Sequence, residues 1–131
     1  MVGDTIGDLI IRLKNASVVG KATVSVPHSK IRKAVLDKLV AAGYIASATE
    51  KGKQVQEKTL EVTLNYENGV SRIQGVKRIS KPGRRLYAGV ADLHPVKFGK
   101  GHMILSTPAG ILTGEEAKEK KVGGEQLFII W

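Results

Sequence analysis

The sequence has no cysteine among its 131 residues, which excludes disulfides and thiolate metal sites. It also has no apolar run of about 18 residues, the length that a membrane-spanning helix needs. Asp4 and Asp8 lie beside the first apolar residues, which is not typical of a signal peptide. We therefore expect a soluble protein of a reducing, cytoplasmic compartment with no membrane partner.

Acidic residues are scarce. Twelve aspartates and glutamates stand against 21 lysines and arginines, which gives a formal net charge of +9. Such an excess is typical of a protein with an anionic partner, most often a nucleic acid. The 42% of hydrophobic residues is enough for a core, and the length suits one domain or two very small ones.

Groupings that could support catalysis are also lacking. His28, His94 and His102 are far apart in the sequence, and no serine has the surroundings of a nucleophile elbow. The one close group of acids follows Thr113, where a capping box with Glu116 explains it. We predict that the protein is not an enzyme and uses no metal or other cofactor.

The first 66 residues predict the order α-β-α-β-β. The helical spacing of Ile6, Leu9, Ile10 and Leu13 predicts a helix over residues 4–16, with Asp4 or Thr5 as its N-cap and with Arg12 and Lys14 near its C-terminal end. A second helix lies between an N-cap at Ser29 and Gly43. Strands are predicted near residues 23–26, 44–48 and 60–66. The second helix begins with three cations that no nearby acid neutralises, so phosphate contact is favoured over a merely exposed face. These cations are Lys30, Arg32 and Lys33.

The turn at residues 67–69 predicts a boundary between an N-terminal α/β domain, residues 1–66, and a C-terminal β-rich domain, residues 67–131. The segment from Arg72 to Arg85 holds six cations and no acid. A strand–turn–strand of this kind favours contact with a sugar–phosphate backbone. Tyr87 follows, either as a core aromatic or as a residue that stacks on a nucleotide.

The last quarter holds an apolar strand, a small polar turn, a capped helix and a terminal apolar strand. The turn at residues 106–110 has small side chains and hydroxyls that suit close approach to RNA. Gly123 is the expected C′ residue of the helix. The run from Leu127 to Trp131 predicts a central strand.

Read together, these motifs resemble the bacterial ribosomal protein S-eight family of the small (30S) subunit, nearly end to end. The most specific elements are Ser80-Lys81-Pro82-Gly83 with Arg85 and Tyr87, and Ser106-Thr107 with Gly110 and Gly123-Gly124-Glu125. The resemblance implies an α+β fold of two small packed domains, the N-terminal α-β-α-β-β unit and a mainly β domain with a short helix.

The resemblance also implies direct binding to the central domain of 16S rRNA and a role in 30S assembly. Family neighbours are small-subunit ribosomal proteins five and two. Some members repress translation by binding their own operon mRNA, and a free-standing repressor of this kind is the alternative function. The expected RNA-binding residues are Asn15, Ser29, Lys30, Arg32, Lys81, Arg84, Arg85, Tyr87, Ser106, Thr107, Pro108, Ala109, Gly110, Gly124 and Glu125.

The turn departs from the family pattern, which is often Ser-Thr-Ser followed by a long polar residue. Here Pro108 and Ala109 remove one hydroxyl, one backbone N–H and one polar side chain. A rigid proline partly offsets this loss by preorganising the loop.

Overall fold

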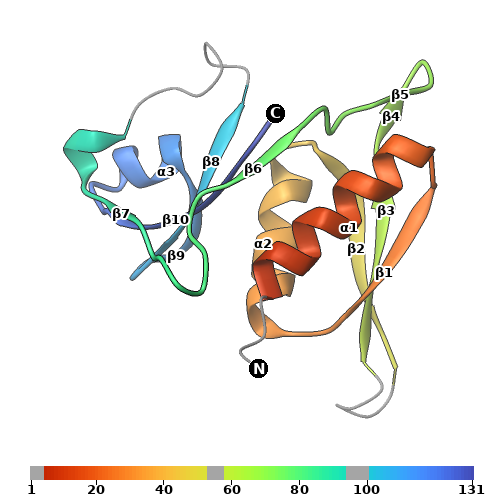
Figure 1. Ribbon diagram of the computed structural model, residues 1–131, viewed down its shortest axis with the longest axis horizontal. Coiled ribbons are helices and arrows are strands. Elements are labelled where there is room, and N and C mark those ends of the chain that lie inside the picture. Colours follow the sequence, from red (N-terminus) through yellow and green to blue (C-terminus); the bar gives the residue numbers. More distant parts are fainter. Residues whose placement is uncertain (1–4, 53–57, 94–100) are drawn as a thin grey trace. The chain divides into compact units, whose positions relative to one another are not determined.

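The computed structural model describes residues 5–52, 58–93 and 101–131. Its backbone contacts form two compact units that meet in the sequence between Gln74 and Gly75. Each unit combines helices with an antiparallel sheet (Figure 1), so the predicted two-domain α+β class is confirmed. The predicted division at residues 66 and 67 stays a prediction.

The first helix, α1 (Thr5–Val19), is longer than predicted. It runs past residue 16 because the next left-handed residue is Gly20, with φ of 78°. Its buried stripe includes the predicted Leu9, Ile10 and Leu13. Cations expected near the helix end therefore lie in its middle, and its last turn holds no basic residue. Of the two N-cap candidates, Thr5 is the first residue of the helix, and residue 4 lies outside the described residues.

The second helix, α2 (Lys30–Ala41), begins as predicted at an N-cap. The Ser29 hydroxyl accepts a hydrogen bond from the N–H of Arg32 at 3.1 Å. Gly43, with φ of 86°, follows the helix C-terminus. Both helices lie against one face of a sheet (Figure 1), where their apolar side chains are buried.

This sheet has the order β1-β3-β2, from β1 (Thr23–Pro27), β2 (Ile45–Lys51) and β3 (Thr59–Leu64). Buried and half-buried residues alternate along β3, which confirms the predicted strand. A hairpin of β4 (Tyr66–Glu67) and β5 (Val70–Ser71) follows. Asn68 and Gly69 at its tip both have positive φ, as a two-residue hairpin turn requires.

The second unit is built on one antiparallel sheet with the order β6-β10-β8-β9, in which β7 also pairs with β10. The strand β10 is central, which confirms the prediction for the C-terminal run. The strand bounds are β6 (Val76–Arg78), β7 (Tyr87–Ala88), β8 (His102–Thr107), β9 (Gly110–Thr113) and β10 (Gly124–Ile130).

One face of this sheet carries α3 (Gly114–Glu119). The predicted capping box is present, with the Thr113 hydroxyl accepting from the N–H of Glu116 at 3.3 Å and the Glu116 carboxylate accepting from the N–H of Thr113 at 3.1 Å. The C′ prediction for Gly123 is wrong, because Lys121 takes the left-handed conformation, with φ of 58°. The sequence also predicts a turn or short helix at residues 93–95, which lies mostly outside the described residues. A short 3-10 helix, η2 (Val90–Asp92), precedes it.

Candidate nucleic-acid interface

The register of the second sheet aligns three predicted site residues. Tyr87 on β7 lies opposite Glu125 on β10, and Glu125 lies opposite Ser106 on β8. Directly paired residues of antiparallel strands project from the same face. We call these three residues the recognition row.

The recognition row lies on the face of the sheet that α3 does not cover. The neighbouring positions Ala88 and Leu105 project from the other face and pack in the cluster that contains Ala117 of α3. Three strands that are far apart in the sequence thus place their side chains in one line. Local sequence patterns contain no information on this register.

The side chains of the recognition row are open to solvent to different degrees. Tyr87 is 71% exposed, so the interpretation as a core aromatic is wrong. It occupies the two-residue strand β7, and its ring is largely exposed among the residues that the structure describes. The Glu125 side chain is only 17% exposed, and its carboxylate accepts from Arg85 at 3.1 Å. An aromatic ring, a fixed carboxylate and a hydroxyl therefore lie side by side.

The glycine pair before Glu125 permits this alignment. A Cβ at Gly124 would collide with the carbonyl oxygen of Ser106 and lie 2.9 Å from the Thr107 methyl group. A Cβ at Gly123 would collide with the carbonyl oxygen of Ala88. The pair therefore lets β10 begin between two backbones, which sequence reasoning did not detect.

The turn between β8 and β9 is a two-residue hairpin. Pro108 and Ala109 form its tip, and both are exposed with Gly110. Gly110 has φ of 112°, a conformation that side chains other than glycine rarely adopt. The Thr107 hydroxyl donates to the carbonyl of Gly110 at 2.8 Å and accepts from the N–H of Ala109 at 3.1 Å.

The basic segment contains a second tight turn. Lys81 and Arg84 exchange two backbone hydrogen bonds of 2.9 Å around Pro82 and Gly83. Ser80 fixes the base of the turn, because its buried hydroxyl bonds both the N–H and the carbonyl of Leu86. All four turn residues are exposed, so two cations project from a rigid tip.

The prediction that the six cations of this segment are all uncompensated is wrong. Arg85 pairs with Glu125, an acid 40 positions away that only the sheet register brings near. Arg78 donates to the carbonyl of Ser80 at 2.8 Å, and the Arg72 guanidinium lies 4.9 Å from the centre of the buried Tyr44 ring. Within the described residues, Lys77, Lys81 and Arg84 have no acidic partner.

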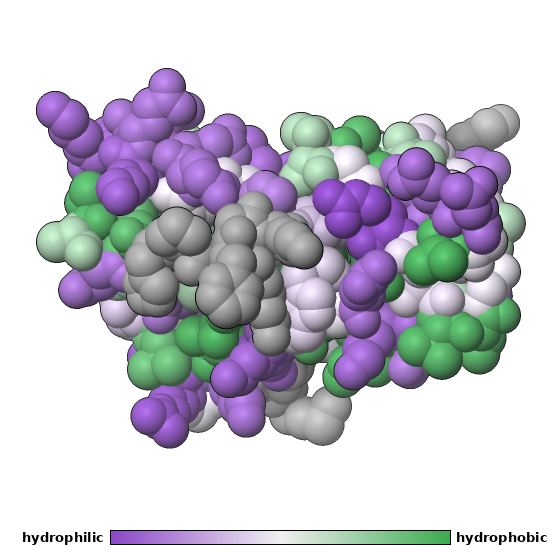
Figure 2. Space-filling view, turned by 90° about the horizontal axis from the view of Figure 1, so that it is seen from above, coloured by the Kyte–Doolittle hydropathy of each residue, from purple (hydrophilic) through white to green (hydrophobic). Residues whose placement is uncertain are grey.

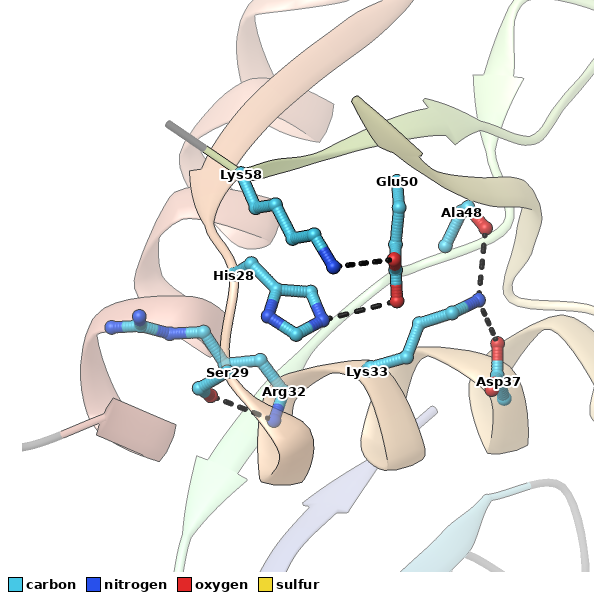
Figure 3. A network of polar contacts seen from close by, with 8 residues as sticks. All are labelled: His28, Ser29, Arg32, Lys33, Asp37, Ala48, Glu50 and Lys58. Atoms are coloured by element: carbon cyan, nitrogen blue, oxygen red, sulfur yellow. Dashed lines mark hydrogen bonds and ion pairs between the residues drawn. The ribbon is translucent and has the colours of Figure 1, made fainter. Parts of the chain in front are cut away.

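The start of α2 also differs from the prediction (Figure 3). Arg32 lies 3.5 Å from Asp8 of α1, and its side chain is 14% exposed. Lys33 pairs with Asp37, one helical turn later, at 2.7 Å. Two of the three cations are thus neutralised, one by an acid of the neighbouring helix α1 and one by an acid in the next turn of α2. Lys30 is exposed and has no ion pair with any described residue.

Beside the Ser29 cap lies an ion cluster that the sequence did not predict (Figure 3). His28 Nε2 lies 3.0 Å from one oxygen of Glu50, and Lys58 Nζ lies 4.0 Å from the other. The three side chains come from a loop, from β2 and from the residue before β3, so no local pattern indicates them. Asn15, the remaining predicted site residue of this unit, is exposed on α1.

The fold and these surfaces define a class, a small basic two-domain α+β binding protein. In the parts of the chain that are described, no three His, Asp or Glu side chains form a metal cluster. No helix there is long and apolar enough to cross a membrane. The face drawn in Figure 2 carries many hydrophilic residues, with several groups of hydrophobic residues between them.

Comparison with known proteins identifies the family. The model of the family described as "Ribosomal protein S8" matches residues 4–131. Proteins named "Small ribosomal subunit protein uS8" from Maricaulis maris and Paracoccus denitrificans are 45% and 42% identical, over 96% and 99% of this chain and 96% and 98% of theirs. That from Mycoplasmopsis synoviae is 41% identical over 98% of this chain and 97% of its own.

The chain therefore belongs to the ribosomal protein S8 family. Membership confirms the predicted resemblance. It makes the protein a structural, non-enzymatic constituent of the small ribosomal subunit, and places it with the ribosome in the cytoplasm.

Proposed function

We propose that this protein binds the central domain of 16S rRNA directly and helps to assemble the 30S subunit. The observation that carries the proposal is the recognition row, in which an exposed tyrosine, a fixed carboxylate and a hydroxyl share one sheet face. Sequence-specific RNA recognition targets unpaired bases, which stack on aromatic rings and form hydrogen bonds through their edges.

Each member of the row has a distinct role in the proposal. The Tyr87 ring stacks on or packs against an unpaired nucleotide. The Ser106 hydroxyl can donate and accept, whereas the Glu125 carboxylate only accepts, so it selects base edges that carry amino groups. Arg85 offsets the negative charge of Glu125 and lowers its repulsion of nearby phosphates. Gly124 contributes by keeping the row aligned.

In this proposal, the RNA phosphates bind to cations that have no acidic partner among the described residues. Lys81 and Arg84 project from a rigid turn in the second unit, and Lys30 projects from the start of α2 in the first. Asn15 is proposed to contact the RNA backbone with Lys30. Ser29 and Arg32 act mainly by fixing the helix start, because the hydroxyl of Ser29 caps the helix and Arg32 is anchored to Asp8.

The test is binding to a 16S rRNA central-domain fragment, with footprinting of the protected nucleotides. Tyr87→Ala and Ser106→Ala should each weaken binding by roughly 1–3 kcal/mol with folding intact. Lys120→Ala, an exposed cation on the α3 side, is the matched control and should bind like the wild type. Wild-type affinity for both site variants would refute the site.

Two finer proposals rest on the resemblance to the family. Proteins five and two are the proposed neighbours in the subunit, which cross-linking within intact 30S particles tests. The same surface could bind a similar structure in the protein's own operon mRNA, as the alternative function requires. Sedimentation separates the two functions, because a free-standing repressor would be absent from 30S particles.

A further inference from the structure

The turn between β8 and β9 is closed by one of its own side chains. The Thr107 hydroxyl has a single hydrogen, and it donates this hydrogen to the carbonyl of Gly110 at 2.8 Å. It also accepts from the N–H of Ala109 at 3.1 Å. The hydroxyl therefore has no hydrogen left to donate to an RNA oxygen. Its two hydrogen bonds instead hold the turn in one conformation.

The tip of the turn offers no backbone donor either. Pro108 has no N–H, and the N–H of Ala109 is bound to Thr107. Both residues are exposed and end in apolar groups. The tip therefore presents carbonyl oxygens, a pyrrolidine ring and a methyl group. Such a surface cannot donate to a phosphate oxygen, but it can accept from a ribose 2′-hydroxyl and pack on a sugar or base face.

Ser106 differs from Thr107 in the hydrogen bonds of its hydroxyl and in its position on the sheet. Its hydroxyl has no hydrogen-bond partner among the residues that the structure describes, so it can still donate and accept. It also belongs to the recognition row, opposite Glu125. The two adjacent hydroxyls, which the sequence treats alike, thus have different surroundings.

We infer that Thr107 is a positioning residue that closes the turn before RNA binds, so that the donor-free Pro108–Ala109 tip meets ribose edges and Ser106 supplies the hydrogen-bonding hydroxyl. A turn that is already ordered loses less conformational entropy on binding. The closing of the turn is a property of the free protein, whereas its use on ribose rests on the proposed function.

Amide hydrogen exchange of the free protein, followed by NMR, tests the closing of the turn. Thr107→Val keeps the shape and removes the hydroxyl, so the Ala109 amide should exchange about tenfold faster. Thr107→Ser restores the hydroxyl and should restore slow exchange. Ser106→Ala should leave the Ala109 amide as in the wild type. Unchanged exchange in Thr107→Val would overturn the positioning role.

Binding to the rRNA fragment tests the division of labour. Thr107→Val and Ser106→Ala should each bind about tenfold more weakly. Neither should change the salt dependence, because no phosphate contact is lost. Thr107→Ser should bind like the wild type, and 2′-deoxy substitution at the protected nucleotides should weaken binding of the wild type. Thr107→Val that binds normally despite fast exchange, or Thr107→Ser that fails to bind, would overturn the inference.

The two proposals fail in different ways. If the wild type binds no rRNA fragment, the proposed function fails, and the exchange rates still decide whether Thr107 closes the turn. If the wild type binds and 2′-deoxy substitution has no effect, the proposed function stands and the ribose-facing tip is refuted.

Discussion

A methyl group at Gly124 should damage the recognition row without touching any of its side chains. The Cβ of Gly124→Ala would collide with the Ser106 carbonyl and lie 2.9 Å from the Thr107 methyl group. The carbonyl belongs to a strand backbone, so relief requires that β10 and β8 move apart where Glu125 pairs with Ser106. Overpacking of this kind costs about 1–3 kcal/mol of unfolding free energy.

Urea or thermal unfolding measures this loss, which corresponds to a lower Tm of roughly 2–10 °C for a chain of this size. RNA affinity should fall with it, because the row is displaced. The matched control is Gly83→Ala, since a Cβ there meets no atom within 4 Å and the residue has no left-handed φ. Gly83→Ala should fold like the wild type. Wild-type stability of Gly124→Ala would show that the strands are not as close as the structure places them.

Three further predictions concern charge and capping. The double variant Lys81→Ala, Arg84→Ala should reduce the slope of log affinity against log salt by roughly 1.4–1.8, about two phosphates, whereas Lys120→Ala should not change it. Thr113→Ala should lower the unfolding free energy by about 0.5–2 kcal/mol, measured by thermal unfolding, because the N–H of Glu116 loses the hydroxyl that accepts its hydrogen bond. Asp8→Ala should cost at most about 1 kcal/mol of stability and should steepen the salt dependence, because Arg32 loses its carboxylate. An unchanged slope would show that Arg32 reaches no phosphate.

The features predicted correctly from the sequence are those that depend on near neighbours in the chain. The alternation along β3 follows from strand geometry, and the cap at Ser29 follows from a hydroxyl three positions before an N–H that needs an acceptor. The capping box of α3 has the same local origin. Each can be stated before the fold is known.

The features that the sequence did not predict depend on which segments meet. The exposure of Tyr87 follows from its place in a short strand at the end of the sheet. Gly123 suits a helix C-terminus by its local pattern, yet it lies where β10 approaches the backbone of Ala88, and Lys121 takes the C′ role. A glycine tolerates both settings, so its presence does not distinguish a cap from a close approach.

The ion pairs explain why counting charges along the chain overestimates the cations available to RNA. Arg32 and Arg85 are each held by an acid from a distant segment, Asp8 and Glu125. A cation paired in this way must give up its partner to bind a phosphate, and the exchange gains little because one ion pair replaces another. Its stronger effect is to fix the position of its partner, as Arg85 does for Glu125 in the recognition row. Specific contacts and electrostatic attraction are thus assigned to different residues. Substitutions in the recognition row should change the RNA affinity at every salt concentration. Substitutions of unpaired cations should instead change the salt dependence of the affinity.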